Sequence, residues 1–225
     1  RLDTANTTDL VVLNQMYFIS NKALGFQKEH VLSLQNAFAL GPKTEAFKQE
    51  LSKLPGVESV GGTSEMPGGP NWFGTSFKKH EDNETVTGRG VIVDDQFAQT
   101  LKMEVSAGRT FSRTYDDTLS VVLNERAVRD LGLGPDPLGK RLVQPGSFFD
   151  RDEKEVTFTV IGVVRDFHFQ SLHEPIVPLF MVYNKVSRGV DNLLAVRVQP
   201  AQFQPFIAQA EQLWHSFLPD QPFAS

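Results

Sequence analysis

The apolar residues of this chain recur with two spacings, one typical of helices and one typical of strands. Helical spacing places Phe47, Leu51 and Leu54 on one face of a helix that ends at Pro55. A longer apolar stripe follows Pro200 and predicts a helix that buries this face in the core rather than offering it to a ligand. The stripe consists of Phe203, Phe206, Ile207, Ala210, Leu213, Trp214 and Phe217.

Two shorter helices are predicted mainly from residues that can cap them. Asp94 can cap a helix that carries Phe97, and Asn124 can cap a helix that Gly132 ends. A further helix is expected over residues 10–24, where the apolar residues again follow helical spacing. The chain therefore has helical segments near both of its ends and in its middle.

Short apolar runs between these helices predict strands. Residues 75–93 alternate enough for a hairpin with a polar turn, whereas residues 61–74 are rich in glycine, proline and serine and predict a long loop. Strand–helix units then lie at both ends of a strand-rich block, which is the order expected when one domain interrupts another. The predicted fold class is α+β. The other strands are expected over residues 31–34, 57–60, 103–111, 121–123, 140–144, 155–165, 166–170, 178–183 and 193–198.

The composition argues against several classes of protein. The chain has 225 residues and a net charge of -5, and without a basic stripe it does not have the footprint of a nucleic-acid-binding protein. It contains no cysteine, so neither disulfides nor thiol catalysis is available. No stretch approaches the ~20 apolar residues that a membrane helix needs. The chain starts at Arg1 without a signal-peptide pattern, and we expect it to be a piece of a larger protein.

One segment carries residues suited to metal or acid–base chemistry. Asp166, His168, His173 and Glu174 lie close together in sequence. If the first two stand on a strand, they share one of its faces, and two phenylalanines lie on the other. A zinc ion needs three or four converging ligands, but prolines place His173 and Glu174 in an extended segment. We therefore favour a half-buried strand with outward polar groups, and the alternative is a metal-dependent hydrolase that uses His168, His173 and Asp166.

The segment 134–141 has part of a phosphate-binding pattern, G-x-x-x-x-G-K. It ends in Arg141 where a phosphate loop needs serine or threonine to hold magnesium. Pro135 and Pro137 also remove two backbone donors that would bind phosphate. The sequence therefore predicts a tight turn between a helix and a strand, not a nucleotide site.

Three residues in loops are candidates for contact with a partner: Trp72, Phe73 and Arg109. Exposed aromatic and arginine side chains often anchor protein partners. The simpler alternatives are that the loop of Trp72 and Phe73 packs on its own domain, and that Arg109 forms an ion pair with Asp116 or Asp117.

Several segments, in this order and spacing, resemble the extracytoplasmic domain of MacB/FtsX-type ABC transporter permeases, with the closest likeness to the Bacteroidetes-like branch. The resemblance runs from about residue 24 to residue 223 and includes the closing amphipathic helix. The other segments that carry it are LGFQKEHVLSL, FKQELSKLPGVESV, SEMPG, VDDQFAQTLKMEVSAGRTFS, SVVLNERAVRDLG, DPLGKRL and FTVIGVVRDFHFQSLHEPIVPLF.

The resemblance implies a division of the chain into subdomains. A tail and a stalk helix would occupy residues 1–27. A Porter-like α/β subdomain would consist of residues 28–112 and 191–225, and a strand-rich, Sabre-like lobe of residues 113–190 would interrupt it.

The resemblance also implies a location and a function. The domain would lie on the periplasmic side of the bacterial inner membrane, between two membrane helices of a permease that pairs as a dimer. It would be non-catalytic, without cofactor or metal, and would couple the work of a cytoplasmic ABC ATPase to substrate export or to a periplasmic adaptor and outer-membrane channel. The hydrolase described above and a small-ligand-binding protein are the alternatives.

Overall fold

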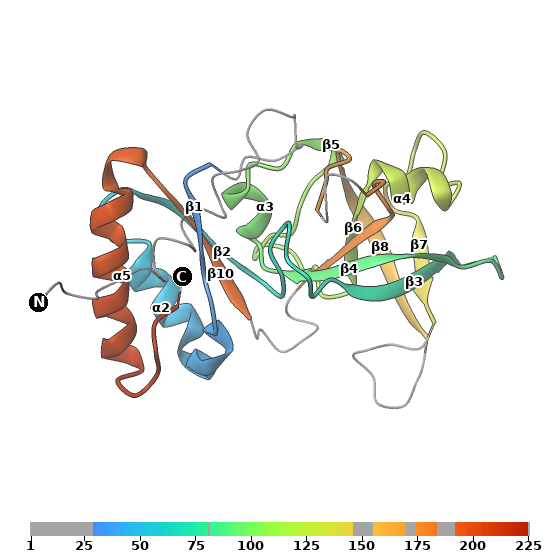
Figure 1. Cartoon of the computed structure of the whole chain (residues 1–225). Coiled ribbons are helices and arrows are strands. Elements are labelled where there is room, and N and C mark those ends of the chain that lie inside the picture. The colour runs from blue at the N-terminus through green and yellow to red at the C-terminus, as the bar shows by residue number, and fades with distance from the viewer. Residues whose placement is uncertain (1–28, 81, 146–154, 170–173, 184–191, 225) are drawn as a thin grey trace, which may run out of the picture.

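The computed structural model describes residues 29–80, 82–145, 155–169, 174–183 and 192–224, which form two lobes joined by a common core (Figure 1). The helix predicted over residues 10–24 lies outside the described residues, as do residues 170–173 of the candidate metal segment. Helices and strands both occur, so the predicted α+β class is confirmed.

The first lobe is a three-stranded antiparallel sheet with helices on one face (Figure 1). It is called the helix-covered lobe below. The strands lie in the order β1 (Val31–Leu34), β10 (Leu193–Val198) and β2 (Val57–Thr63). The helices are α2 (Thr44–Leu51) and α5 (Phe203–Phe217), preceded by the 3-10 helices η1 (Ala37–Lys43) and η3 (Pro200–Gln202).

The apolar stripe of α5 packs against this sheet as predicted. Phe206 and Trp214 are buried, and Leu213 and Phe217 are partly buried against the same cluster. The Trp214 ring meets the Phe47 ring of α2 edge to face, with 5.7 Å between the ring centroids. Alternate residues of β10 point toward these helices, because successive side chains of a strand lie on opposite faces.

The second lobe is a closed barrel of six strands, called the barrel lobe below. The pairing runs β4-β3-β7-β8-β6-β9, and β9 pairs in parallel with β4 to close the ring. A short strand, β5 (Val105–Gly108), continues beside β8 where β7 ends, and α4 (Glu125–Asp130) follows β6. The barrel strands are β3 (Phe73–Lys79), β4 (Val86–Val93), β6 (Ser120–Asn124), β7 (Arg141–Gln144), β8 (Val156–Val164) and β9 (Leu179–Tyr183).

Apolar side chains from all six strands fill the barrel. The rings of Phe77 and Phe180 stack with 4.4 Å between centroids, and the ring of Phe158 meets Phe77 edge-on at 5.7 Å. Asn124 caps α4 as predicted, since its side-chain oxygen accepts the N–H of Ala127 at 2.9 Å. Closure gives each of the six barrel strands a partner on both sides, so the described barrel strands form no open sheet edge.

A third apolar cluster lies between the lobes and includes residues of both. Val31 and Ala195 come from the helix-covered lobe, and Val91 and Met181 from the barrel. The helix α3 (Phe97–Thr100) lies between them and packs directly on β2. A Cβ atom on Gly61 of β2 would lie 2.6 Å from the Cα of Phe97, so glycine permits this close approach.

A buried arginine also links the sheet to α3. The Arg197 guanidinium of β10 donates to the carbonyl of Thr100 at 2.7 Å and to that of Glu29 at 3.0 Å. Burial lowers the pKa of Arg197, partly offset by nearby glutamates. The side chain therefore ties the end of α3 to the chain that enters β1.

The strand predicted over residues 166–170 is wrong. The described residues 165–169 belong to no strand. The Arg165 N–H donates to the Glu104 carbonyl, and the Phe169 carbonyl accepts the N–H of Gly68, which lies in a loop. The alternation of exposure is nevertheless present, because Phe167 and Phe169 are buried whereas Asp166 and His168 are only partly so.

The barrel draws on both of the predicted subdomain segments. β3 and β4 come from residues 28–112, and they pair with strands from residues 113–190. The division at residues 113 and 190 stays a prediction, because strand pairing alone does not set the limits of a subdomain.

Candidate functional site

The polar side chains of the candidate metal segment do not share one binding partner: Asp166 binds α4, and His168 lies at a surface hollow. The Asp166 carboxylate accepts the N–H of Arg126 and a guanidinium N–H of Arg129, each at 2.7 Å. Asp166 therefore neutralises a side chain of α4 and accepts a backbone donor at the start of that helix. This explains a carboxylate at this position without a metal ion.

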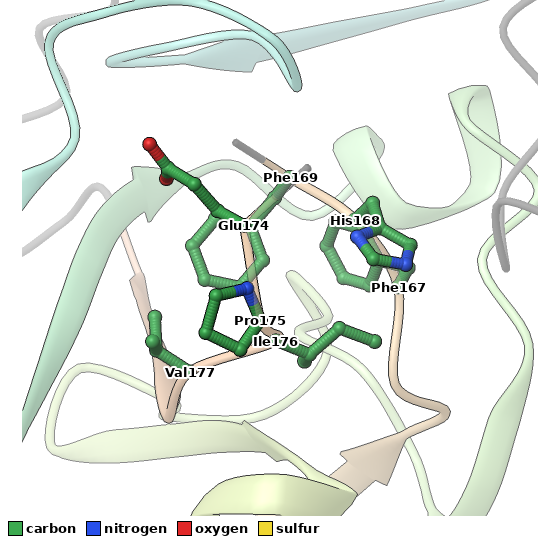
Figure 2. A pocket seen from close by; sticks show the side chains of 7 residues that line it. All are labelled: Phe167, His168, Phe169, Glu174, Pro175, Ile176 and Val177. Atoms are coloured by element: carbon green, nitrogen blue, oxygen red, sulfur yellow. The ribbon is translucent and has the colours of Figure 1, made fainter. Parts of the chain in front are cut away.

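His168 borders a shallow hollow with a volume of about 150 Å³, which includes open solvent. Figure 2 shows the carboxylate of Glu174 and the imidazole of His168 at opposite sides of this hollow, so they do not converge on one point. Within the described parts of the chain, no group of three His, Asp or Glu side chains could hold a metal ion. His173 lies outside the described residues. The residues that line the hollow are Phe167, His168, Phe169, Glu174, Pro175, Ile176 and Val177.

The loop that carries Trp72 packs on its own domain. Trp72 is 4% exposed, and its ring lies 4.7 Å from the ring of Phe169. The buried carboxylate of Glu65 accepts the N–H groups of Met66 and Asn71 at 2.9 and 2.7 Å, which holds the loop in shape. The packing alternative is thus confirmed for Trp72, and a partner contact by the half-buried Phe73 stays a prediction.

Arg109 forms an ion pair with Asp117, one of the two aspartates that the sequence offers as its partner. Two guanidinium N–H groups donate to the two carboxylate oxygens of Asp117, both at 2.7 Å. The guanidinium lies 4.1 Å from the ring centroid of Tyr115, which is 56% exposed. A partner contact by Arg109 itself stays a prediction.

The electrostatics of this clamp follow from its hydrogen bonds. Burial acts to raise the pKa of Asp117, but hydrogen bonds from Arg109 and from the N–H of Ser112 outweigh it, so the pKa of Asp117 is lowered. The same hydrogen bond raises the pKa of Arg109. The clamp is therefore charged at neutral pH, and its guanidinium makes a cation–π contact with Tyr115.

Exposed apolar side chains lie around the Arg109–Asp117 clamp. Tyr115 and Leu119 come from the loop before β6. The side chain of Leu138, in the turn before β7, lies next to Gly108. Large exposed apolar residues that lie near one another are a feature of surfaces that meet partners. Three of the five large apolar side chains that are exposed among the described residues therefore lie in this part of the barrel lobe.

The segment 134–141 is a turn between α4 and β7, as predicted. Gly134 and Gly139 have φ angles of 71° and 76°, a region that favours glycine. The Lys140 ammonium donates to the carbonyl of Leu133 and so stabilises this turn.

A charged cluster between α2 and the start of α3 was not expected from the sequence. Lys48 is 5% exposed, and its ammonium lies 2.5 Å from a carboxylate oxygen of Asp94, which is 2% exposed. The signal was present in the sequence, because Thr44, Phe47, Lys48 and Leu51 follow helical spacing and all four are buried. Lys48 thus lies within the stripe that faces the protein.

No helix in the described part of the chain is both long and apolar enough to cross a membrane.

The sequence profile of the MacB-like periplasmic core domain matches residues 3–213. The curated proteins searched gave no match.

Solved structures show the same fold. The periplasmic region of MacB from Actinobacillus actinomycetemcomitans is 17% identical, with a TM-score of 0.60 and 89% of each chain covered. The extracellular domain of the ABC-type transporter YknZ from Gram-positive bacteria is 18% identical, with a TM-score of 0.53, covering 76% of this chain and 82% of that one. A domain of a protein described as a permease from Porphyromonas gingivalis is 22% identical, with a TM-score of 0.53 and coverages of 76% and 68%.

The family match spans nearly the whole chain and agrees with the observed fold and with the resemblance noted in the sequence, although the Bacteroidetes-like branch stays a prediction. The chain therefore belongs to the MacB-like periplasmic core domain family and is a domain of an ABC-type transporter permease on the periplasmic side of the inner membrane.

Proposed function

We propose that this domain is non-catalytic and transmits movement. An ABC ATPase on the cytoplasmic side drives the membrane helices, and the domain passes their motion to a substrate or to a periplasmic adaptor and outer-membrane channel. Two permease subunits act as a dimer. No residue of the domain makes or breaks a covalent bond in this proposal.

The observation that carries the proposal is the apolar cluster shared by the two lobes. It contains Val31 at the start of β1 and reaches Met181 in the barrel. Protein interiors are close-packed and deform little, so a displacement at one lobe reaches the other. A domain that transmits movement requires this property.

The two ends of the described chain support a membrane-facing position for the helix-covered lobe. The Glu29 carbonyl accepts from Arg197 of β10, and the Ala224 carbonyl accepts from the N–H of Gln35 at 2.8 Å. Both ends thus attach to the sheet of that lobe. In the proposal this lobe corresponds to the Porter-like subdomain, and the barrel lobe points away from the membrane.

The barrel lobe then presents its exposed side chains to a periplasmic partner. Tyr115, Leu119 and Leu138 are the main candidates, and Arg109 contacts the ring of Tyr115. Phe73 is a further candidate contact on the same lobe. A preformed surface loses little conformational freedom on binding, which favours affinity.

The test is to lock neighbouring subunits in the full permease. The chain has no cysteine, so single cysteines can be placed at exposed positions such as Gln49 of α2 or Gln212 of α5. A disulfide between the helix-covered lobes of two subunits should abolish transport and leave ATP binding intact, and reduction should restore transport. The unoxidised variant is the control. Normal transport by the locked permease would contradict the proposal.

A further inference from the structure

Asp94 holds together elements of both lobes. It follows the last residue of β4, and its N–H donates to the Gly62 carbonyl of β2 at 2.9 Å. One carboxylate oxygen accepts the N–H groups of Gln96 and Phe97, at 2.9 and 2.8 Å, where α3 begins. The other oxygen pairs with Lys48 of α2. Both carboxylate oxygens of Asp94 therefore have hydrogen-bond partners, one at the start of α3 and the other on α2.

A second set of charges repeats this connection at the surface. Arg113, in the loop between β5 and β6, donates to Asp95 at 2.8 Å and pairs with Glu45 of α2 at 2.7 Å. Lys48 also pairs with Glu45 at 2.9 Å. Five side chains of alternating charge thus connect α2 to two segments that adjoin the barrel.

The buried pair is unusual for a position between packed elements. Taking two charges out of water costs free energy, and apolar side chains of similar volume would often be at least as stabilising. What this pair provides is a fixed position, because moving the ammonium away from the carboxylate would leave two buried charges without partners. The shared apolar core resists compression, and the pair adds resistance to the small sliding movements that packed helices can still make.

We propose that Lys48 and Asp94, with Glu45, Asp95 and Arg113, form a charge lock that fixes α2 against the end of β4. The lock keeps the two lobes in a single relative orientation. This inference concerns the domain by itself and goes beyond its proposed function, so the two can fail separately.

The lock can be tested in the 225-residue chain by pulsed EPR. Spin labels at Gln212→Cys on α5 and Asp136→Cys in the turn before β7 report the distance between the lobes; both positions are exposed. The parent should give one narrow distance distribution. The Lys48→Met/Asp94→Asn variant should broaden it about twofold, since domain interfaces without specific ties shift readily.

The double substitution is chosen to keep the chain folded. Methionine retains the apolar stem of Lys48, and the asparagine oxygen still accepts the N–H groups that begin α3. Lys48→Met alone would leave a buried carboxylate without its counter-charge, which is strongly destabilising. Arg113→Gln, at a side chain that is 52% exposed, is a milder second variant and should broaden the distribution in the same way but less.

The matched control is Arg129→Met/Asp166→Asn. It makes the same exchange at an ion pair whose carboxylate also accepts a helix N–H, but all its partners lie within the barrel lobe. The control should leave the distribution as narrow as in the parent. The lock is wrong if the parent distribution is already broad, if neither lock variant broadens it, or if the control broadens it equally.

Discussion

At the scale of single residues, Asp117 is buried but charged. Its folded pKa is lowered, so it lies below the value of about 3.9 for an unfolded aspartate. The stabilisation of the folded chain by the Asp117 carboxylate is therefore complete at pH values above the unfolded pKa. It is lost as the pH falls through the folded pKa.

Asp117→Asn should for this reason destabilise the chain at pH 7 and much less in acid. The expected loss at pH 7 is about 1.5–3 kcal/mol, typical of hydrogen bonds to a charged group. Urea unfolding at pH 7 and at about pH 3 measures the difference between parent and variant, which should shrink at the lower pH. The exposed neighbour Asp116→Asn is the control. A loss that is equal at both pH values would contradict the assigned charge.

The residues of the candidate metal segment show what sequence can and cannot predict at this scale. The alternation that buries Phe167 and Phe169 was readable from residue types alone. The hydrogen bonds of Asp166 could not be predicted in this way, because its partners Arg126 and Arg129 lie on a helix about 40 residues earlier. Similarly, the spacing that places Lys48 in the stripe of α2 indicates its burial, but the partner Asp94 comes from another lobe.

At the scale of elements, α5 was predictable because its stripe repeats over the whole of Phe203–Phe217. The barrel was not, because its closure depends on a parallel pairing of β4 with β9, between Arg89 and Leu179 at one end and Val93 and Tyr183 at the other. No local pattern encodes a contact across so long a stretch of chain. The mistaken strand at 166–170 has the same origin, since alternation does not reveal whether a partner strand is present.

The buried stripe of α5 gives a prediction for this element. Phe206 is 1% exposed, so Phe206→Ala should leave a cavity and cost about 3–5 kcal/mol of unfolding free energy. Gln212→Ala, on the exposed side of the same helix, should change it by no more than about 0.5 kcal/mol. Urea unfolding followed by circular dichroism compares the two. Equal effects would mean that the assigned buried face is wrong.

At the scale of the whole molecule, three apolar clusters decide how the domain behaves. One fills the helix-covered lobe, one fills the barrel, and the third contains residues of both lobes. Breaking the third cluster exposes apolar surface on each lobe at once, so neither lobe can unfold without destabilising the other. The domain is therefore expected to unfold as one cooperative unit.

The two tryptophans allow this expectation to be tested. Trp214 belongs to the cluster of the helix-covered lobe and Trp72 to the shared cluster, where it contacts Phe169 beyond the end of β8. Trp72→Phe leaves Trp214 as the fluorescence probe of the helix-covered lobe. Trp214→Phe leaves Trp72 as the probe of the shared cluster. Within each variant, the urea midpoint from fluorescence should coincide with that from far-UV circular dichroism, because both report one transition. Comparison within a variant also removes the stability change that each substitution causes. Midpoints that separate in either variant would show that the lobes unfold independently, and the shared cluster would then be too weak to carry movement between them.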